Sequence, residues 1–159
     1  MDVGEIAEIL SKCELFRDLS DKEIRSIAKL GRIEKFKAGE TIYEQDTIGT
    51  KLYILSEGQV SLERRVDLGG DRKALITVFA LRERPSRRLM GCWCTLVGEQ
   101  HIQMCSAVCG KQTKVVSLRC SDLREAMIKD STIRIKILEK LVLLLRDRID
   151  SSYGAIEAL

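Results

Sequence analysis

The segment of residues 39–62 constrains the fold of this chain more than any other part of the sequence. A short apolar run at residues 41–43 is followed by a polar loop, and residues 52–55 then lead through Gly58 to a second apolar run at residues 60–62. Two β-rich runs separated by a short turn that contains glycine are typical of a β-hairpin. We therefore expect antiparallel β-structure in the middle of the chain.

Helical patterns come before this region, and the period-two pattern continues beyond it. Apolar residues recur at helical spacing over residues 3–10, and Ser20 and Glu23 have the spacing of a capping box at the start of a second helix. Further β-rich runs lie at residues 105–108 and 114–118. The sequence therefore predicts N-terminal helices followed by about seven or eight strands.

The pattern returns to helix after residue 118. Ser121 can cap a short helix, and Ser131 or Thr132 can cap a long one that runs to about Asp150. Helices, then strands, then helices in this order indicate an α+β fold built on an antiparallel β-roll of the jelly-roll type. We expect one domain over the 159 residues, with helices in 1–31, the β-roll in 32–118 and helices in 119–159.

Charge and hydropathy exclude several classes of protein. The net charge of +3 is too small to predict a nucleic-acid-binding protein, and four arginines gather in the polar segment 82–88, which also holds Pro85 and is typical of a solvated loop. No signal peptide is recognisable, and the longest apolar block, residues 141–145, is far shorter than a membrane span. We expect a cytoplasmic protein that does not enter a membrane.

The segment 39–62 also resembles a signature, GE-x-I followed by LY-x-I-x-x-G-x-V, of the cyclic-nucleotide-binding domain in Crp/Fnr regulators and kinase regulatory subunits. The resemblance covers roughly residues 14–150. It implies a β-roll and a regulatory role. In that family a short helix and its flanking loop hold the nucleotide, in a pattern resembling F-G-E-(L/I/A)-A-L followed by R-(S/A)-A. The glutamate accepts from the ribose, and the arginine contacts the phosphate.

The corresponding segment here has lost both charged residues. It reads MGCWCTLV over residues 90–97, so Cys92 or Trp93 replaces the acid, and Gln103 or Met104 replaces the arginine. Each lost hydrogen bond to a charged group contributes about 1.5–3 kcal/mol, so we do not expect tight binding of cAMP or cGMP in the usual manner. The candidate residues for a pocket that binds some small molecule are Gly91, Cys92, Trp93, Cys94, Thr95, Gln103, Met104 and Ser106.

Trp93 is the only tryptophan, and two interpretations of it stay open: it stacks on a planar ligand, or it fills the pocket. His101 is the only histidine and stands in a polar stretch, where we expect it to be exposed. No catalytic constellation emerges from the sequence, which therefore does not predict an enzyme.

Four of the six cysteines lie close together in the sequence. Cys92, Cys94, Cys105 and Cys109 suggest a metal or cluster site or a reversible thiol switch, although C-x-C followed by C-x3-C is not a usual zinc spacing. Plain packing of buried cysteines is the third interpretation. No cofactor is identified.

The long C-terminal helix corresponds to the dimer helix of the family. Its apolar residues suggest a homodimer seam made by Ile137, Leu138, Leu141, Leu144 and Leu145. Only residues 151–159 follow it, too few for the helix-turn-helix domain of Crp-type regulators, so direct DNA binding is not expected. We interpret the chain as a ligand-responsive regulatory module that signals through a partner protein. The alternatives are a cysteine-based redox or metal sensor and a degenerate protein-interaction domain.

Overall fold

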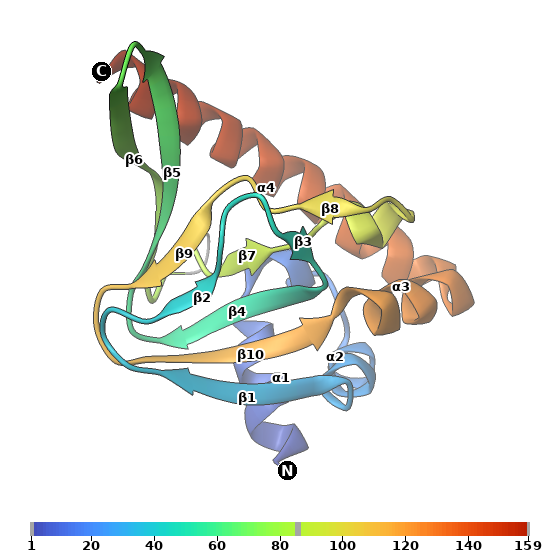
Figure 1. The fold of residues 1–159 in the computed structure, drawn as a ribbon. Helices are drawn as coiled ribbons and strands as arrows, with labels where there is room; N and C mark the ends of the chain where they lie inside the picture. The colour runs from blue at the N-terminus through green and yellow to red at the C-terminus, as the bar shows by residue number, and fades with distance from the viewer. Residues whose placement is uncertain (1, 85–86, 159) are drawn as a thin grey trace.

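The structure, a computed structural model, describes residues 2–84 and 87–158 (Figure 1). The predicted loop position of Pro85 and the end residues of the predicted domain, Met1 and Leu159, lie outside the described residues. The helices are α1 (Val3–Ser11), η1 (Glu14–Phe16), α2 (Asp21–Ala28), η2 (Cys94–Val97), α3 (Cys120–Lys129) and α4 (Ser131–Glu157). The strands are β1 (Gly31–Phe36), β2 (Thr41–Tyr43), β3 (Ile48–Gly49), β4 (Lys51–Glu57), β5 (Val60–Gly69), β6 (Arg72–Leu81), β7 (Leu89–Gly91), β8 (His101–Ile102), β9 (Ser106–Cys109) and β10 (Thr113–Arg119).

The strands form two four-stranded antiparallel sheets and a short ribbon. One sheet has the order β1-β10-β4-β7, the other has the order β2-β9-β5-β6, and β3 pairs with β8. The predicted α+β class with an antiparallel β-roll is confirmed. The sequence prediction of strands omitted β3, β7 and β8, because runs of two or three residues carry little detectable period.

The predicted hairpin between residues 52–55 and 60–62 is wrong. β4 pairs with β10 and β7, whereas β5 belongs to the other sheet and pairs with β6 and β9. Gly58, with φ of 109°, turns the chain from one sheet to the other, and a Cβ there would lie 2.7 Å from the Cα of Thr113. Glycine is therefore required at this corner of the roll.

The alternation along the strands separates two apolar cores. In β4, Leu52 and Ile54 point to the helices, while Leu55 faces the interior of the roll. β10 repeats this division, with Val116 on the helix side and Val115 on the roll side. Because successive residues of a strand point to opposite faces, one sheet serves both cores. We call them the helix-side core and the roll interior.

The helices cover the outer face of the β1-β10-β4-β7 sheet, and α4 runs behind the roll to the β5–β6 hairpin (Figure 1). Within the described residues, none of these helices is long and apolar enough to cross a membrane. The capping box at the start of α2 is confirmed: the Glu23 N–H donates to Ser20 Oγ at 3.2 Å, and the Ser20 N–H donates to Glu23 Oε1 at 2.9 Å.

The predicted caps of the last two helices are wrong. α3 begins at Cys120, one position before Ser121. α4 is capped by Asp130, whose carboxylate accepts from the N–H groups of Thr132 and Ile133, and the helix continues past Asp150 to Glu157. An aspartate with extended backbone just before the helix is as good a cap as serine and better than threonine.

Candidate functional site

The segment that follows β7 is folded into the helix-side core. Gly91 has φ of 106°, and the Cys92 N–H donates to the Lys51 carbonyl at 3.0 Å. The Cys92 side chain is fully buried, with its Sγ 3.4 Å from Thr95 Oγ1, and its carbonyl accepts from the Cys120 thiol at 3.0 Å. The position at which the family would carry its acid is therefore occupied, under one alignment, by a buried thiol that faces the helices.

Trp93 also contacts the helix-side core rather than the roll interior. It packs against the helix-side core, and its ring meets the His101 ring edge-on, with the ring centroids 4.9 Å apart. His101, expected to be exposed, is only 1% exposed, because its strand β8 is covered on the side from which the ring projects. Its polar sequence neighbours gave no sign of this burial.

The candidate residues after β8 are largely committed to internal contacts. Gln103 is buried, and its backbone N–H and carbonyl pair with Thr47 and Asp46 at 2.8 Å. Ser106 Oγ accepts from the Gln45 N–H at 2.9 Å. Met104 is 53% exposed. Because Thr95 and Ser106 already use their hydroxyls within the protein, this segment offers few free polar groups to a ligand.

The four clustered cysteines do not gather. Cys92 lies in the helix-side core, whereas Cys109 lies in the roll interior and Cys105 packs against it. No three side chains of the types His, Cys, Asp or Glu are placed to hold a metal ion within the described residues, which include all six cysteines. The suggested tetrad of Cys92, Cys94, Cys105 and Cys109 is therefore not brought together, since Cys92 lies in one core and Cys109 in the other.

A functional residue that the sequence reasoning missed is Arg148 on α4. Its guanidinium carbon lies 3.8 Å from the centre of the Phe79 ring, and the side chain donates to the Leu89 carbonyl. Its Nε is buried without a partner, and no carboxylate forms an ion pair with it among the described residues. Burial lowers the pKa of Arg148 to about 10. A partly buried guanidinium whose Nε is buried and unpaired, and which has no ion-pair partner among the described residues, is unfavourable, so the site is suited to an anion.

The signal for Arg148 was present in the sequence. The buried residues Ile137, Leu141 and Leu144 follow one another at intervals of three or four, and Arg148 continues the same stripe. A helical stripe that passes from leucine to arginine places the arginine toward the core.

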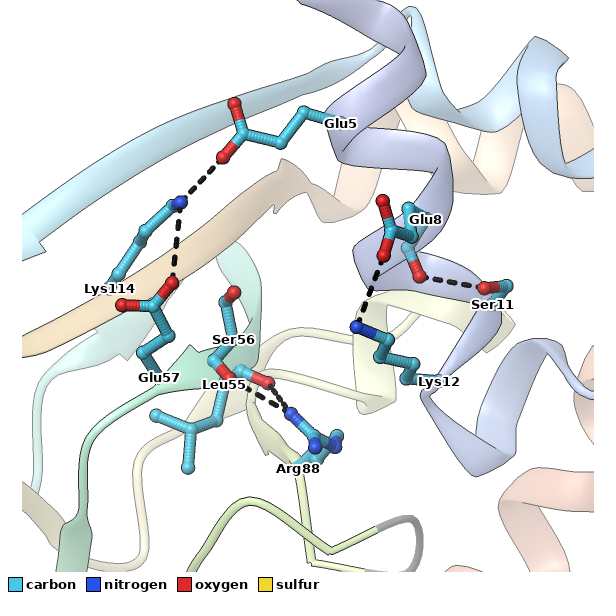
Figure 2. A network of polar contacts seen from close by, with 9 residues as sticks. All are labelled: Glu5, Glu8, Ser11, Lys12, Leu55, Ser56, Glu57, Arg88 and Lys114. Atoms are coloured by element: carbon cyan, nitrogen blue, oxygen red, sulfur yellow. Dashed lines mark hydrogen bonds and ion pairs between the residues drawn. The ribbon is translucent and has the colours of Figure 1, made fainter.

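Two arginines of the segment 82–88 are also drawn inward, which corrects the expectation of a wholly solvated loop. Arg88 is 9% exposed and donates to the carbonyls of Leu55 and Ser56 at 2.9 and 3.0 Å (Figure 2). Arg87 lies over the Phe79 ring, 4.8 Å from its centre. Phe79 is thus in contact with two guanidinium groups.

A pocket of about 380 Å³ lies beside Phe79, between β6 and α4. It is lined by Phe79, Arg87, Asp147, Asp150 and Ser151. This volume is within the range of small-molecule sites. Ser151 closes one side, because its hydroxyl donates to the Val78 carbonyl at 2.7 Å. The pocket combines an aromatic wall with charges of both signs, and Arg148 contacts the same ring.

The predicted dimer stripe requires a correction. Ile137, Leu141 and Leu144 are buried in the helix-side core of their own chain, and Leu138 and Leu145 are only partly buried. These three buried side chains are unavailable to a second copy, because α4 uses them to dock on its own chain.

α4 carries a second apolar stripe, whose isoleucine and valine positions are exposed and whose leucine positions are partly buried against the helix-side core. The exposed residues Ile135, Val142, Ile149 and Ile156 recur every seven residues, and Leu138 and Leu145 fall three residues after the first two of them. This is the heptad pattern of a coiled coil, with β-branched residues at position a and leucine at position d.

Comparison with known proteins identifies the fold. The chain is similar to a cyclic nucleotide-binding domain from Methylobacillus flagellatus, at 20% identity and a TM-score of 0.76 over 98% of this chain and 83% of that one. It is also similar to the sensor domain of the transcriptional regulator DNR from Pseudomonas aeruginosa, at 16% identity and a TM-score of 0.68 over 93% of both chains. No family model and no curated protein matches the sequence.

The N-terminal domain of a transcriptional regulator from Streptomyces coelicolor gives a similar result, with 20% identity and a TM-score of 0.68 over 90% of this chain and 94% of that one. At these identities the similarity is one of fold. The chain has the β-roll fold of the cyclic nucleotide-binding domains.

Proposed function

We propose that this chain, which has the fold of the cyclic nucleotide-binding domains, is a regulatory module whose helix α4 responds to a small anionic ligand. The observation that carries the proposal is Arg148, a partly buried cation with a buried, unpaired Nε and no carboxylate partner among the described residues. The usual cyclic nucleotides are disfavoured as ligands, because neither Cys92 nor Trp93 can replace an acid and neither Gln103 nor Met104 can replace an arginine.

The contacts of α4 suggest how a ligand would act. Near its C-terminal end, the helix is attached to the roll by Arg148, which touches Phe79 and Leu89, and by Ser151, which donates to Val78. An anion in the adjoining pocket would pair with Arg87 or draw Arg148 away from the Leu89 carbonyl. Either event changes how α4 docks, and a partner protein would read the change.

The same proposal includes a homodimer in which the second apolar stripe of α4 forms the seam. Isoleucine or valine at position a with leucine at position d favours a coiled coil of two parallel helices. Ile135, Val142 and Ile149 are each more than half exposed, at 55, 66 and 53%. A second α4 would remove this surface from water.

A thermal-shift screen tests the ligand class. The chain is scanned with cAMP, cGMP, cyclic dinucleotides and a set of linear phosphates and carboxylates, and each hit is confirmed by calorimetry. Arg148→Met should abolish the shift caused by a hit. Arg146→Met is the matched control, since Arg146 is exposed on the same helix and pairs with Asp147 at 3.3 Å.

Two outcomes would overturn the proposal. Equal affinities of Arg148→Met and Arg146→Met for a hit would show that Arg148 is not part of the ligand site. Micromolar or tighter binding of cAMP that is unaffected by Arg148→Met would show that the altered segment of residues 90–97 still holds a nucleotide.

A further inference from the structure

A second group of reactive side chains lies away from Arg148, around η2 and β8. Cys94 begins η2 and is partly exposed, and its Sγ lies 3.2 Å from His101 Nδ1. His101 is almost completely buried, and its Nε2 has no hydrogen-bond partner among the described residues. A thiol that solvent can reach is thus paired with a buried imidazole.

The surroundings hold the imidazole in one orientation. β8 pairs with β3 so that His101 stands opposite Gly49, and a Cβ on Gly49 would lie 3.0 Å from His101 Cδ2 and 2.6 Å from Gln103 Nε2. Only glycine allows this close approach. With Trp93 edge-on to the ring, His101 is confined from two sides.

The pair is uncharged at rest. Burial lowers the pKa of His101, although the neighbouring Gln103 amide acts in the opposite direction. Burial and the nearby Cys92 and Glu99 raise the pKa of the Cys94 thiol. At neutral pH the imidazole is therefore free to accept a proton, which is the state that a general base requires.

We propose that Cys94 is a modification site, a thiol that His101 deprotonates as the sulfur attacks a small peroxide. The Cys94 Sγ bonds to one peroxide oxygen while the O–O bond breaks. The thiol proton passes to His101 Nδ1 and then to the departing oxygen, which leaves as water. The sulfur is oxidised to a sulfenic acid by two electrons, and the peroxide is reduced. This chemistry does not depend on the proposed response to an anion.

The chain contains its own control for this proposal. Cys105 is also a partly exposed free thiol, and burial raises its pKa as well. It cannot have an imidazole beside it, because His101 is the only histidine and lies against Cys94. Arg64 and Arg148 lower the pKa of Cys105, whereas Cys92 and Glu99 raise that of Cys94, so the charged neighbours alone would make Cys105 the more reactive thiol. A faster reaction at Cys94 would therefore point to His101.

The experiment exposes the full chain to hydrogen peroxide, traps sulfenic acid with a cyclic 1,3-dione and measures each cysteine by peptide mass spectrometry. A positioned base accelerates proton transfer by about 10²–10⁴-fold, so at pH 6.5 Cys94 should be labelled at least about tenfold faster than Cys105. From pH 6.5 to 8.5 the Cys94 rate should change little, whereas the Cys105 rate should rise about tenfold per pH unit as its thiolate forms.

His101→Gln should slow the labelling of Cys94, make its rate rise with pH as that of Cys105 does, and leave the labelling of Cys105 unchanged. The comparison of the two cysteines in the unsubstituted chain stands even if this variant does not fold. Equal rates for Cys94 and Cys105 at pH 6.5, or parallel pH profiles, would overturn the proposal. The fluorescence of Trp93 gives a second readout, of changes at His101, since the two rings are in contact.

Discussion

Replacing Arg148 with methionine separates a ligand-binding role from a structural one. An arginine that only clamps α4 to the roll would stabilise the chain, and its loss would be costly. An arginine whose role is to bind an anion should destabilise the ligand-free protein. The sign of the change in unfolding free energy therefore decides between the two.

The magnitude follows from two opposing contributions. The contacts with the Leu89 carbonyl and the Phe79 ring stabilise the side chain by about 2–4 kcal/mol. The pKa of Arg148 nevertheless falls from 12.5 to about 10, because burial outweighs these contacts. A fall of this size corresponds to about 3 kcal/mol against the charged form. Methionine has similar reach and no charge, and its thioether packs well on an aromatic ring.

We therefore expect Arg148→Met to leave the unfolding free energy within about 1 kcal/mol of the starting value or to raise it by up to about 2 kcal/mol. Urea denaturation at pH 7, read by circular dichroism, measures the change. Arg146→Met supplies the reference for an exposed arginine on the same helix, where about ±0.5 kcal/mol is expected. A loss of more than about 2 kcal/mol for Arg148→Met would refute the reasoning and make Arg148 a structural clamp.

Further predictions concern the second stripe of α4, the close approach of Gly49 to His101 and Gln103, and the carboxylate of Glu23 on α2. Val142→Asp should shift the chain from dimer to monomer in sedimentation, because it places a charge at the seam, whereas Leu143→Asp, one position outside the stripe, should not; an unchanged dimer in both would exclude the seam. Gly49→Ala should lower the unfolding free energy by about 1–3 kcal/mol in urea, since its Cβ meets two buried side chains, and no loss would contradict the close approach. Hydrogen bonds from Lys136 and the Ser20 N–H lower the pKa of Glu23 below its usual 4.5, so their stabilisation is present above pH 4.5 and is lost as the pH falls through the lowered value; Glu23→Gln should flatten that part of the pH profile of stability.

Much of the fold could be predicted because it follows from period and capping. The helical spacing over residues 3–10 and the capping box at Ser20 and Glu23 depend on neighbours in the sequence, and both are present. The strands that contain residues 52–55 and 60–62 were also recognisable, but not their partners. Pairing is decided by distant segments, and the glycine turn between them joins two sheets instead of closing a hairpin.

The candidate site was harder to predict, because burial of polar residues is a tertiary property. His101 lies in a polar stretch of sequence, yet the fold of β3 over β8 buries it against Cys94. Helical spacing identified the apolar residues of α4 without separating the set that docks on the same chain from the set left open to solvent. Both stripes contain leucine and isoleucine at helical intervals, so only the structure separates Ile137 from Val142.

The two stripes of α4 have a mechanical consequence. They lie about a third of a turn apart on one helix of 27 residues, so the helix cannot rotate one stripe without rotating the other. A rotation that carries Arg148 away from Phe79 turns Val142 and Ile149 through the same angle. In a symmetric homodimer, the second stripes of the two α4 helices pack against each other. Rotation of one helix would therefore require the partner helix to turn as well. Occupancy of one pocket would then change the affinity of the other, and binding would be cooperative, with a Hill coefficient between 1 and 2.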